Sequence, residues 1–149
     1  MKPTIYTVIT YIAGEEGWHD RCGDYHSGKE SELKIQYFTD KNEAGEACGI
    51  SQFENSDAEI KVLIDGMSPD ECHDFLTTEE QEDLSWEVDD IFVIGHKKHE
   101  QLQEVARKQA EEVKLKKEQE EALKKQKEIE RIEKIEREQL AQLMAKYKQ

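Results

Sequence analysis

The segment 17–28, with the sequence GWHDRCGDYHSG, is the part of the chain richest in side chains that can do chemistry. His19, Cys22 and His26 follow one another at H-x2-C-x3-H spacing, which is short enough for three zinc ligands to surround one ion. A metal site is therefore one alternative for this segment, although the spacing is less specific than paired CxxC motifs.

The same segment contains the residue types of a cysteine nucleophile and its helpers. Cys22 has His19 or His26 as a candidate base. Asp20 or Asp24 is the group that would orient that base. Because the order of these residues matches no known catalytic family, a cysteine-dependent enzyme is a second alternative and not the leading one.

A third interpretation of the segment is non-catalytic. Its aromatic rings would pack the loop onto a sheet while its polar residues form turns. The exposed side chains would then contribute to a partner-binding surface, for which the candidates are Trp18, Asp20, Asp24 and Tyr25.

The segment 65–90 carries eleven Asp and Glu residues and no Lys or Arg. It is either a solvated surface or a docking surface for a basic protein, since complementary charge speeds encounter and fixes orientation. Mimicry of nucleic acid, with carboxylates in place of phosphates, is a special case of docking. Calcium binding is disfavoured because the glycine-punctuated loop of an EF-hand is absent. The candidate binding residues are Asp70, Asp74, Glu79, Glu80, Glu82, Asp83, Asp89 and Asp90.

Charge is distributed unevenly along the 149 residues, whose formal net charge is -14. Residues 1–96 contain 23 acidic and 6 basic residues, a net charge of -17, whereas residues 97–149 contain 12 acidic and 15 basic residues, a net charge of +3. The acidic part repels nucleic acid and anionic membranes. We therefore expect a basic protein partner, with neither direct nucleic-acid binding nor membrane association.

The cysteines indicate a reducing compartment. Cys22, Cys48 and Cys72 are odd in number, lie far apart and follow no secretory signal, which predicts free thiols and a cytoplasmic location. Cys48, or Cys72 with His73, would supply the fourth ligand of a zinc site. The leading interpretation requires no cofactor.

Three segments are predicted to be strands from composition and alternation. Residues 4–12 are β-branched or aromatic on both faces, which is typical of a strand near the centre of a sheet. Residues 59–65 alternate and residues 91–94 form a short apolar run, so both are expected to be strands. Gly95 is expected to mark the exit from the sheet.

Residues 32–38 complete the expected sheet as the hairpin partner of the first strand. Their alternation places Leu33, Ile35 and Tyr37 on one face, which we expect to be buried. The sheet would then have four strands.

Helices are expected between and after these strands. A helix capped at Asp40 is predicted to run to about Phe53, and its narrow face of small residues permits close approach to the sheet. Capping-box sequences at Ser68 and Thr78 predict two further short helices, the first ending at Phe75.

From His96 onward the chain lacks Pro and Gly and is dominated by residues that favour helices, which predicts one long helix. Oppositely charged i,i+4 pairs such as Glu104 and Lys108 stabilise such a helix without a core. Its apolar patches would self-associate into a homo-oligomer or cover a partner, although no heptad repeat is sustained. The candidate oligomerisation residues are Leu102, Val105, Ile129, Ile132, Ile135, Leu140, Leu143 and Met144.

These elements predict an α+β protein with a small, mostly antiparallel four-stranded sheet and short helices, followed by one long charged C-terminal helix that is a candidate coiled coil. The predicted domains are an acidic α+β head, residues 1–95, and an extended charged helix, residues 96–149.

The run YFTDKNEA, from Tyr37 to Ala44, joins a strand directly to a capped helix. In this respect it resembles small uncharacterised accessory proteins of tailed bacteriophages. The resemblance implies an accessory role in the host cytoplasm, such as inhibition of a host enzyme or defence system, and it supplies no catalytic residues.

The leading hypothesis from the sequence is a non-enzymatic acidic protein that binds a basic partner protein. One alternative is a small zinc-binding protein or cysteine-dependent enzyme centred on His19, Cys22 and His26. The other is a structural coiled-coil spacer.

Overall fold

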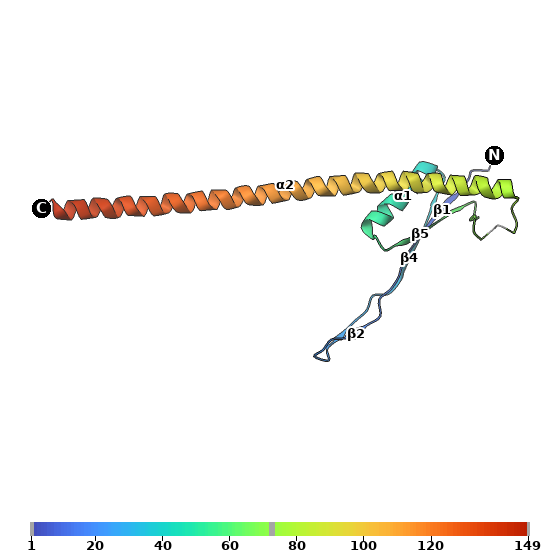
Figure 1. The fold of residues 1–149 in the computed structure, drawn as a ribbon, viewed down its shortest axis with the longest axis horizontal. Coiled ribbons are helices and arrows are strands. Elements are labelled where there is room, and N and C mark those ends of the chain that lie inside the picture. Colours follow the sequence, from blue (N-terminus) through green and yellow to red (C-terminus); the bar gives the residue numbers. More distant parts are fainter. Residues whose placement is uncertain (1, 72–73, 149) are drawn as a thin grey trace. The chain divides into compact units, whose positions relative to one another are not determined.

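The computed structural model describes residues 2–71 and 74–148. Its elements, in chain order, are β1 (Tyr6–Ile12), β2 (Trp18–His19), β3 (Tyr25–His26), β4 (Glu32–Phe38), α1 (Lys41–Glu54), β5 (Glu59–Ile64) and α2 (Thr78–Tyr147). The chain forms two compact units, Met1–Glu104 and Val105–Gln149. Helix α2 begins in the first unit and continues through the second (Figure 1). The predicted α+β class, with small antiparallel sheets and one long C-terminal helix, is confirmed.

Strand β1 is the centre of a three-stranded antiparallel sheet with the order β4-β1-β5. In the middle of the sheet, Ile9 of β1 lies opposite Ile35 of β4 and Lys61 of β5. The central position of β1 and its hairpin pairing with β4 are therefore as the sequence predicts. β-Branched and aromatic residues suit such a strand because they pack well on a pleated surface.

One face of this sheet carries the hydrophobic core. Tyr6 and Val8 of β1 are buried there, in the same cluster as Val62 and Ile64 of β5. The helices that cover this face contribute the buried residues Ala44, Cys48, Leu84 and Ile91.

Helix α1 is positioned by its cap and by glycines. The side chain of Asp40 accepts a hydrogen bond of 2.7 Å from the backbone amide of Asn42, which starts the helix where the sequence predicts. A Cβ added to Gly49 would lie 2.3 Å from the carbonyl oxygen of Gly95. The small-residue face of α1 therefore allows α2 to approach closely, and Gly95 lies inside α2 at this crossing and not at a strand exit.

Residues 91–94 are helical, so the prediction of a strand there was wrong. A short apolar run has no periodicity of its own, and here Ile91 belongs to a stripe spaced i, i+4, i+7 with Leu84 and Val88 that packs on the core. Helix α2 begins at Thr78, well before His96.

The prediction of two short helices before residue 91 was also wrong. The capping box uses Thr77 and Glu80, because the amide of Glu80 donates to Thr77 Oγ1 at 3.2 Å and the amide of Thr77 donates to Glu80 Oε2 at 3.0 Å. It starts the long helix and not a short one. Between residues 68 and 75, the described residues after Pro69 form turns in place of a helix.

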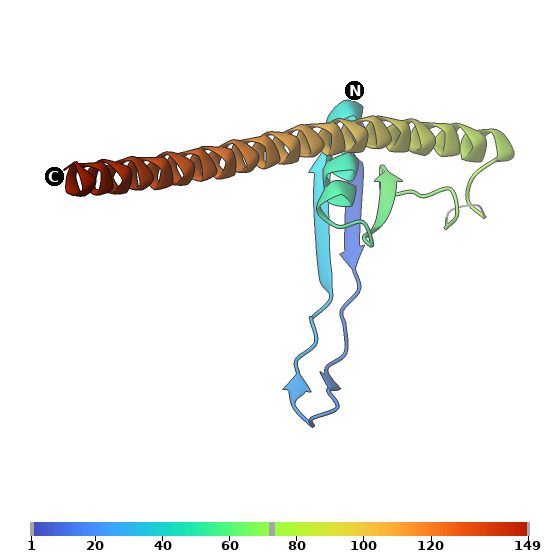
Figure 2. The same cartoon turned by 60° about the vertical axis from the view of Figure 1, so that its left-hand side comes forward.

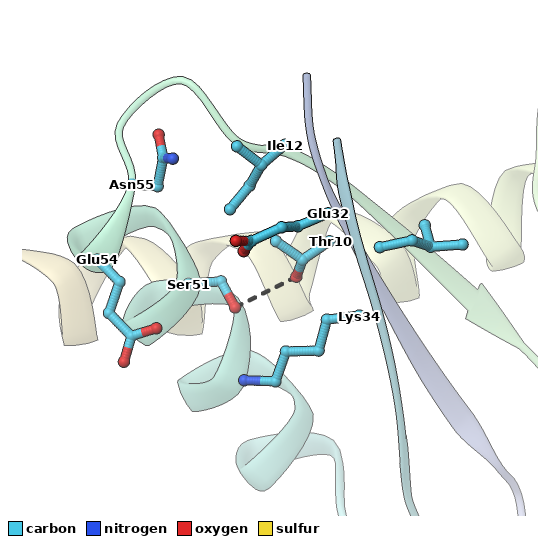
Figure 3. A pocket seen from close by; sticks show the side chains of 8 residues that line it. Thr10, Ile12, Glu32, Lys34, Ser51, Glu54 and Asn55 are labelled. Atoms are coloured by element: carbon cyan, nitrogen blue, oxygen red, sulfur yellow. Dashed lines mark hydrogen bonds between the residues drawn. The ribbon is translucent and has the colours of Figure 1, made fainter. Parts of the chain in front are cut away.

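Strand β4 turns its apolar face away from the core, contrary to the prediction. Leu33, Ile35 and Tyr37 are exposed. The alternate residues Glu32 and Lys34 line a cavity against α1, where their side chains point towards the helix (Figure 3). The physical reason is that α1 covers the sheet mainly over β1, which leaves the inner positions of β4 at a polar margin.

Candidate interaction surfaces

Residues 13–31, which include the segment 17–28 interpreted above as a loop, form a hairpin arm that continues beyond β1 and β4 (Figure 2). The amide of Glu15 donates to the carbonyl oxygen of Lys29 at 2.9 Å. Further out, β2 and β3 form a separate two-stranded sheet. The arm therefore holds its tip in a defined conformation.

Two cross-strand ring pairs stabilise the tip of the arm. Trp18 stacks on His26 with ring centroids 4.3 Å apart, and His19 lies tilted against Tyr25 at 5.1 Å. Trp18 and Tyr25 therefore pack within the arm and not on the main sheet, and both remain exposed. Aromatic rings in such cross-strand positions stabilise a short ribbon.

Asp20 organises the turn between β2 and β3. Its Oδ1 accepts hydrogen bonds of 2.9 Å from the backbone amides of Cys22 and Asp24, and its Oδ2 lies 3.1 Å from Nε2 of His26. The hydrogen bond with His26, followed by those from the backbone amides, holds the pKa of Asp20 below its ordinary value. Asp20 therefore has a structural role that its prediction as a partner-binding residue did not include.

The tip does not assemble the predicted zinc ligands. His26 pairs with Trp18 and His19 with Tyr25, so the two histidines point to opposite faces of the ribbon. Within residues 2–71 and 74–148, no group of three His, Cys, Asp or Glu side chains is arranged to hold a metal ion.

The other proposed zinc ligands are not at the tip. Cys48 is buried in the core, where burial raises the pKa of its thiol to about 11. Cys72 and His73 lie outside the described residues.

The first turns of α2 present an acidic surface. Glu79, Glu82, Asp83 and Asp89 are exposed, on the side of the helix away from the buried Leu84. Asp70 and Asp74, in the preceding turns, are exposed as well. This is the dense negative surface that the sequence predicts.

Trp86 lies in the middle of this surface and was missed by sequence reasoning. It is 71% exposed. At 100° per residue, Glu79, Glu82, Asp83 and Asp89 fall within about 60° of it around the helix. The available signal was an aromatic residue three or four positions from several acids, which predicts a shared helical face.

A cavity of about 350 Å³ flanks the acidic surface. Its apolar lining comes from Ile64, Met67, Leu76 and Leu84. Its acidic lining comes from Asp65, Glu80, Asp83 and Glu87. An apolar hollow with carboxylates around it suits a Lys or Arg side chain, because the aliphatic stem packs on the floor while the charged group reaches the rim.

Besides Asp20, two further predicted binding residues have roles within the fold. Asp90 accepts a hydrogen bond of 2.9 Å from Lys41 Nζ of α1, and this contact raises the pKa of Lys41. Glu80 belongs to the capping box of α2. Both are therefore poor positions for testing partner binding, because their substitution also changes the head.

In the second unit, helix α2 carries an exposed apolar stripe near its end. Ile129, Ile132, Leu140, Leu143 and Met144 fall within an arc of about 120°, with Ile135 outside it. All are exposed. The predicted oligomerisation residues Leu102 and Val105 lie far along the chain from this stripe, Leu102 being only partly exposed.

No model of a known protein family matches this sequence, and comparisons with curated proteins and with solved structures gave no match. None of the described helices is both long enough and apolar enough to cross a bilayer. The bacteriophage resemblance stays a prediction.

Proposed function

We propose that this protein is a non-enzymatic interaction protein whose acidic head binds a basic partner protein through the first turns of α2. The observation that carries the proposal is the exposed Trp86 surrounded by Glu79, Glu82, Asp83 and Asp89 on the free side of the helix. Tryptophan is enriched at the energetic centres of protein interfaces, and its ring also attracts an arginine or lysine placed over it.

The cavity beside this surface supports the same partner chemistry. Asp83 belongs both to the surface and to the acidic rim of the cavity. A partner segment with two basic side chains would place one over Trp86 and the other in the cavity. This gives the acidic head a way to recognise a basic sequence and not only to attract positive charge.

The inhibitor role implied by the phage resemblance is a special form of this proposal. Carboxylates along the helix would occupy the basic groove of a host enzyme, including one that binds nucleic acid. In that case DNA or RNA would compete with the protein for the captured partner, whereas a docking site elsewhere on the partner would be insensitive to nucleic acid.

The C-terminal stripe favours a supporting role for the second unit. Ile129, Ile132 and Leu143 are exposed on one side of a helix whose surface is mostly polar and charged. Such a stripe is better explained by burial against another helix than by exposure. We propose that it joins copies of the chain and so increases the avidity of the acidic heads.

The test uses a triple variant, Glu79→Gln, Glu82→Gln and Asp83→Asn. The immobilised full chain captures basic proteins from an extract of its native host. The captured protein that binds most tightly is purified, and its affinity for the chain is measured by calorimetry. We expect at least a tenfold weaker affinity for the variant, and weaker binding of the unmodified chain as salt rises, since exposed charges are screened within about 10 Å at 0.1 M.

A matched variant controls for total charge. Glu16→Gln, Glu30→Gln and Glu46→Gln change the net charge by the same amount at exposed positions outside α2. If the two triple variants weaken binding equally, the α2 surface has no special role and the proposal fails. Trp86→Ala should weaken binding more than Trp18→Ala, which removes an exposed tryptophan from the arm.

A further inference from the structure

The main sheet has one face that neither helix covers. Because cross-strand partners point to the same side, the register divides the sheet into two sets of side chains. One set includes Tyr6 and Val8 and forms the core with α1 and α2. The other set, here called the open face, consists of three cross-strand rows: Tyr37–Thr7–Leu63, Ile35–Ile9–Lys61 and Leu33–Tyr11–Glu59.

The open face is mostly apolar, and it is exposed along β4 and at Tyr11, whereas Thr7 is buried and Ile9 and Leu63 are half-buried. Tyr37 is 70% exposed, Leu33 64%, Ile35 47% and Tyr11 40%. These four side chains are neighbours across β1 and β4, so they form a continuous patch and not scattered exposed residues. A continuous apolar patch of this kind marks an interaction surface.

Strand β4 alternates between apolar and polar residues, and its apolar residues lie on the open face. Its apolar residues alternate with Glu32, Lys34 and Gln36, and the side chains of Glu32 and Lys34 point towards α1. A strand with one apolar face normally turns that face to a packed layer, since the side-chain period of two fixes which residues are buried. Neither α1 nor α2 supplies such a layer for the open face.

Charge decides which molecule supplies that layer. Of the nine open-face residues, only Glu59 and Lys61 are charged, and their charges cancel. A basic protein is attracted to the acidic turns of α2 in preference to a neutral face. Two copies of this chain, each with a net charge of -14, repel one another wherever their acidic surfaces meet. At a neutral apolar face two copies meet with the least of that repulsion.

We propose that the open face is the contact between two copies of this chain, packed sheet against sheet around Ile9 and Ile35. Three strands about 4.8 Å apart, with seven residues at about 3.4 Å each, cover roughly 340 Å² per copy. A standard stable interface uses about 800 Å² per partner. The head-to-head dimer is therefore weak and reversible, and it forms at high protein concentration.

The first test is sedimentation velocity on the full chain from about 10 μM to about 1 mM. The unmodified chain should show concentration-dependent self-association that strengthens with salt, because salt screens the repulsion between acidic copies. Ile35→Lys, at an exposed site outside the core, should weaken head association at least tenfold. Ile132→Lys, the matched change on the C-terminal stripe, should leave head association in place.

The second test detects the contact directly. Isotope-filtered NMR on mixed labelled and unlabelled full-length chains should show intermolecular NOEs from the methyl groups of Ile9 and Ile35. A chain that stays monomeric at about 1 mM overturns the proposal, as does self-association unchanged by Ile35→Lys, or an oligomer that lacks these NOEs. The opposite salt dependence separates this proposal from basic-partner binding, so either can fail alone.

Discussion

The substitution Gly49→Ala tests the close crossing of α1 and α2, on which the core of the head depends. Helix propensity alone predicts that Ala stabilises α1 by up to about 1 kcal/mol. The structure predicts the opposite sign. The added Cβ would lie 2.3 Å from the carbonyl oxygen of Gly95, and this atom is backbone, so one helix must move.

The size of the destabilisation by Gly49→Ala follows from how closely the added Cβ would approach the carbonyl oxygen of Gly95. Ordinary contact of Cβ with a neighbouring atom lies between 3.4 and 4 Å, so the helices must separate by roughly 1 Å. Overpacking of this kind costs about 1–3 kcal/mol or more. We expect the free energy of unfolding of the head to fall by about 2 kcal/mol, which is roughly a thirtyfold increase in the equilibrium constant for its opening.

A graded series strengthens the test. At Gly45 the nearest atoms are Cγ2 and Cβ of Ile94, at 2.5 and 2.6 Å, so the clash is shallower than at Gly49 but Cβ cannot move without its backbone. At Gly95 the nearest atom is the carbonyl oxygen of Gly45, at 3.0 Å. The predicted order of destabilisation is therefore Gly49→Ala, then Gly45→Ala, then Gly95→Ala. Glu46→Ala, an exposed change in α1, should alter stability by no more than about 0.5 kcal/mol.

The assay must report on the head, because the long helix dominates any overall helical signal. Native-state hydrogen exchange of the buried Val8 amide in β1 is suitable, since it measures the opening of the sheet. Slower exchange at Val8 in Gly49→Ala, as propensity alone predicts, would refute the close crossing. So would equal effects at Gly45, Gly49 and Gly95.

Two further predictions follow from the environments of single residues. Because the pKa of Asp20 is lowered by its hydrogen bonds, its carboxylate stabilises the arm tip above a pH of about 4, and this contribution is lost as pH falls through the depressed pKa of the folded state. NMR chemical shifts of the Trp18 and His26 rings should show the loss of this stabilisation in acid. The role of Asp20 is contradicted if acid leaves these shifts unchanged. It is also contradicted if Asp20→Asn and the control Asp24→Asn change them equally. Because burial raises the pKa of the Cys48 thiol to about 11, iodoacetamide at neutral pH should alkylate Cys48 at least about 100-fold more slowly than the exposed Cys22 in a Cys72→Ser chain. Mass spectrometry of the two peptides measures the rates, and similar rates would show that Cys48 is accessible.

Local sequence signals were sufficient for the elements that they control. The Asp40 cap fixed the start of α1, and β-branched composition identified β1 as the central strand. The helix-favouring composition after His96 identified the C-terminal part of α2. The exposed acidic segment was also readable, because eleven carboxylates without a basic neighbour in sequence cannot be buried.

Tertiary packing decided the rest. The run of residues 91–94 has no period that separates strand from helix, and in the fold it is helical, with Ile91 in the core beside Ala44 and Cys48. The alternation of β4 fixed which residues share a face but not which face α1 would cover, and so the apolar side of β4 remained exposed. Local propensities act over a few residues, whereas burial depends on which distant elements arrive, and sequence spacing alone does not contain that information.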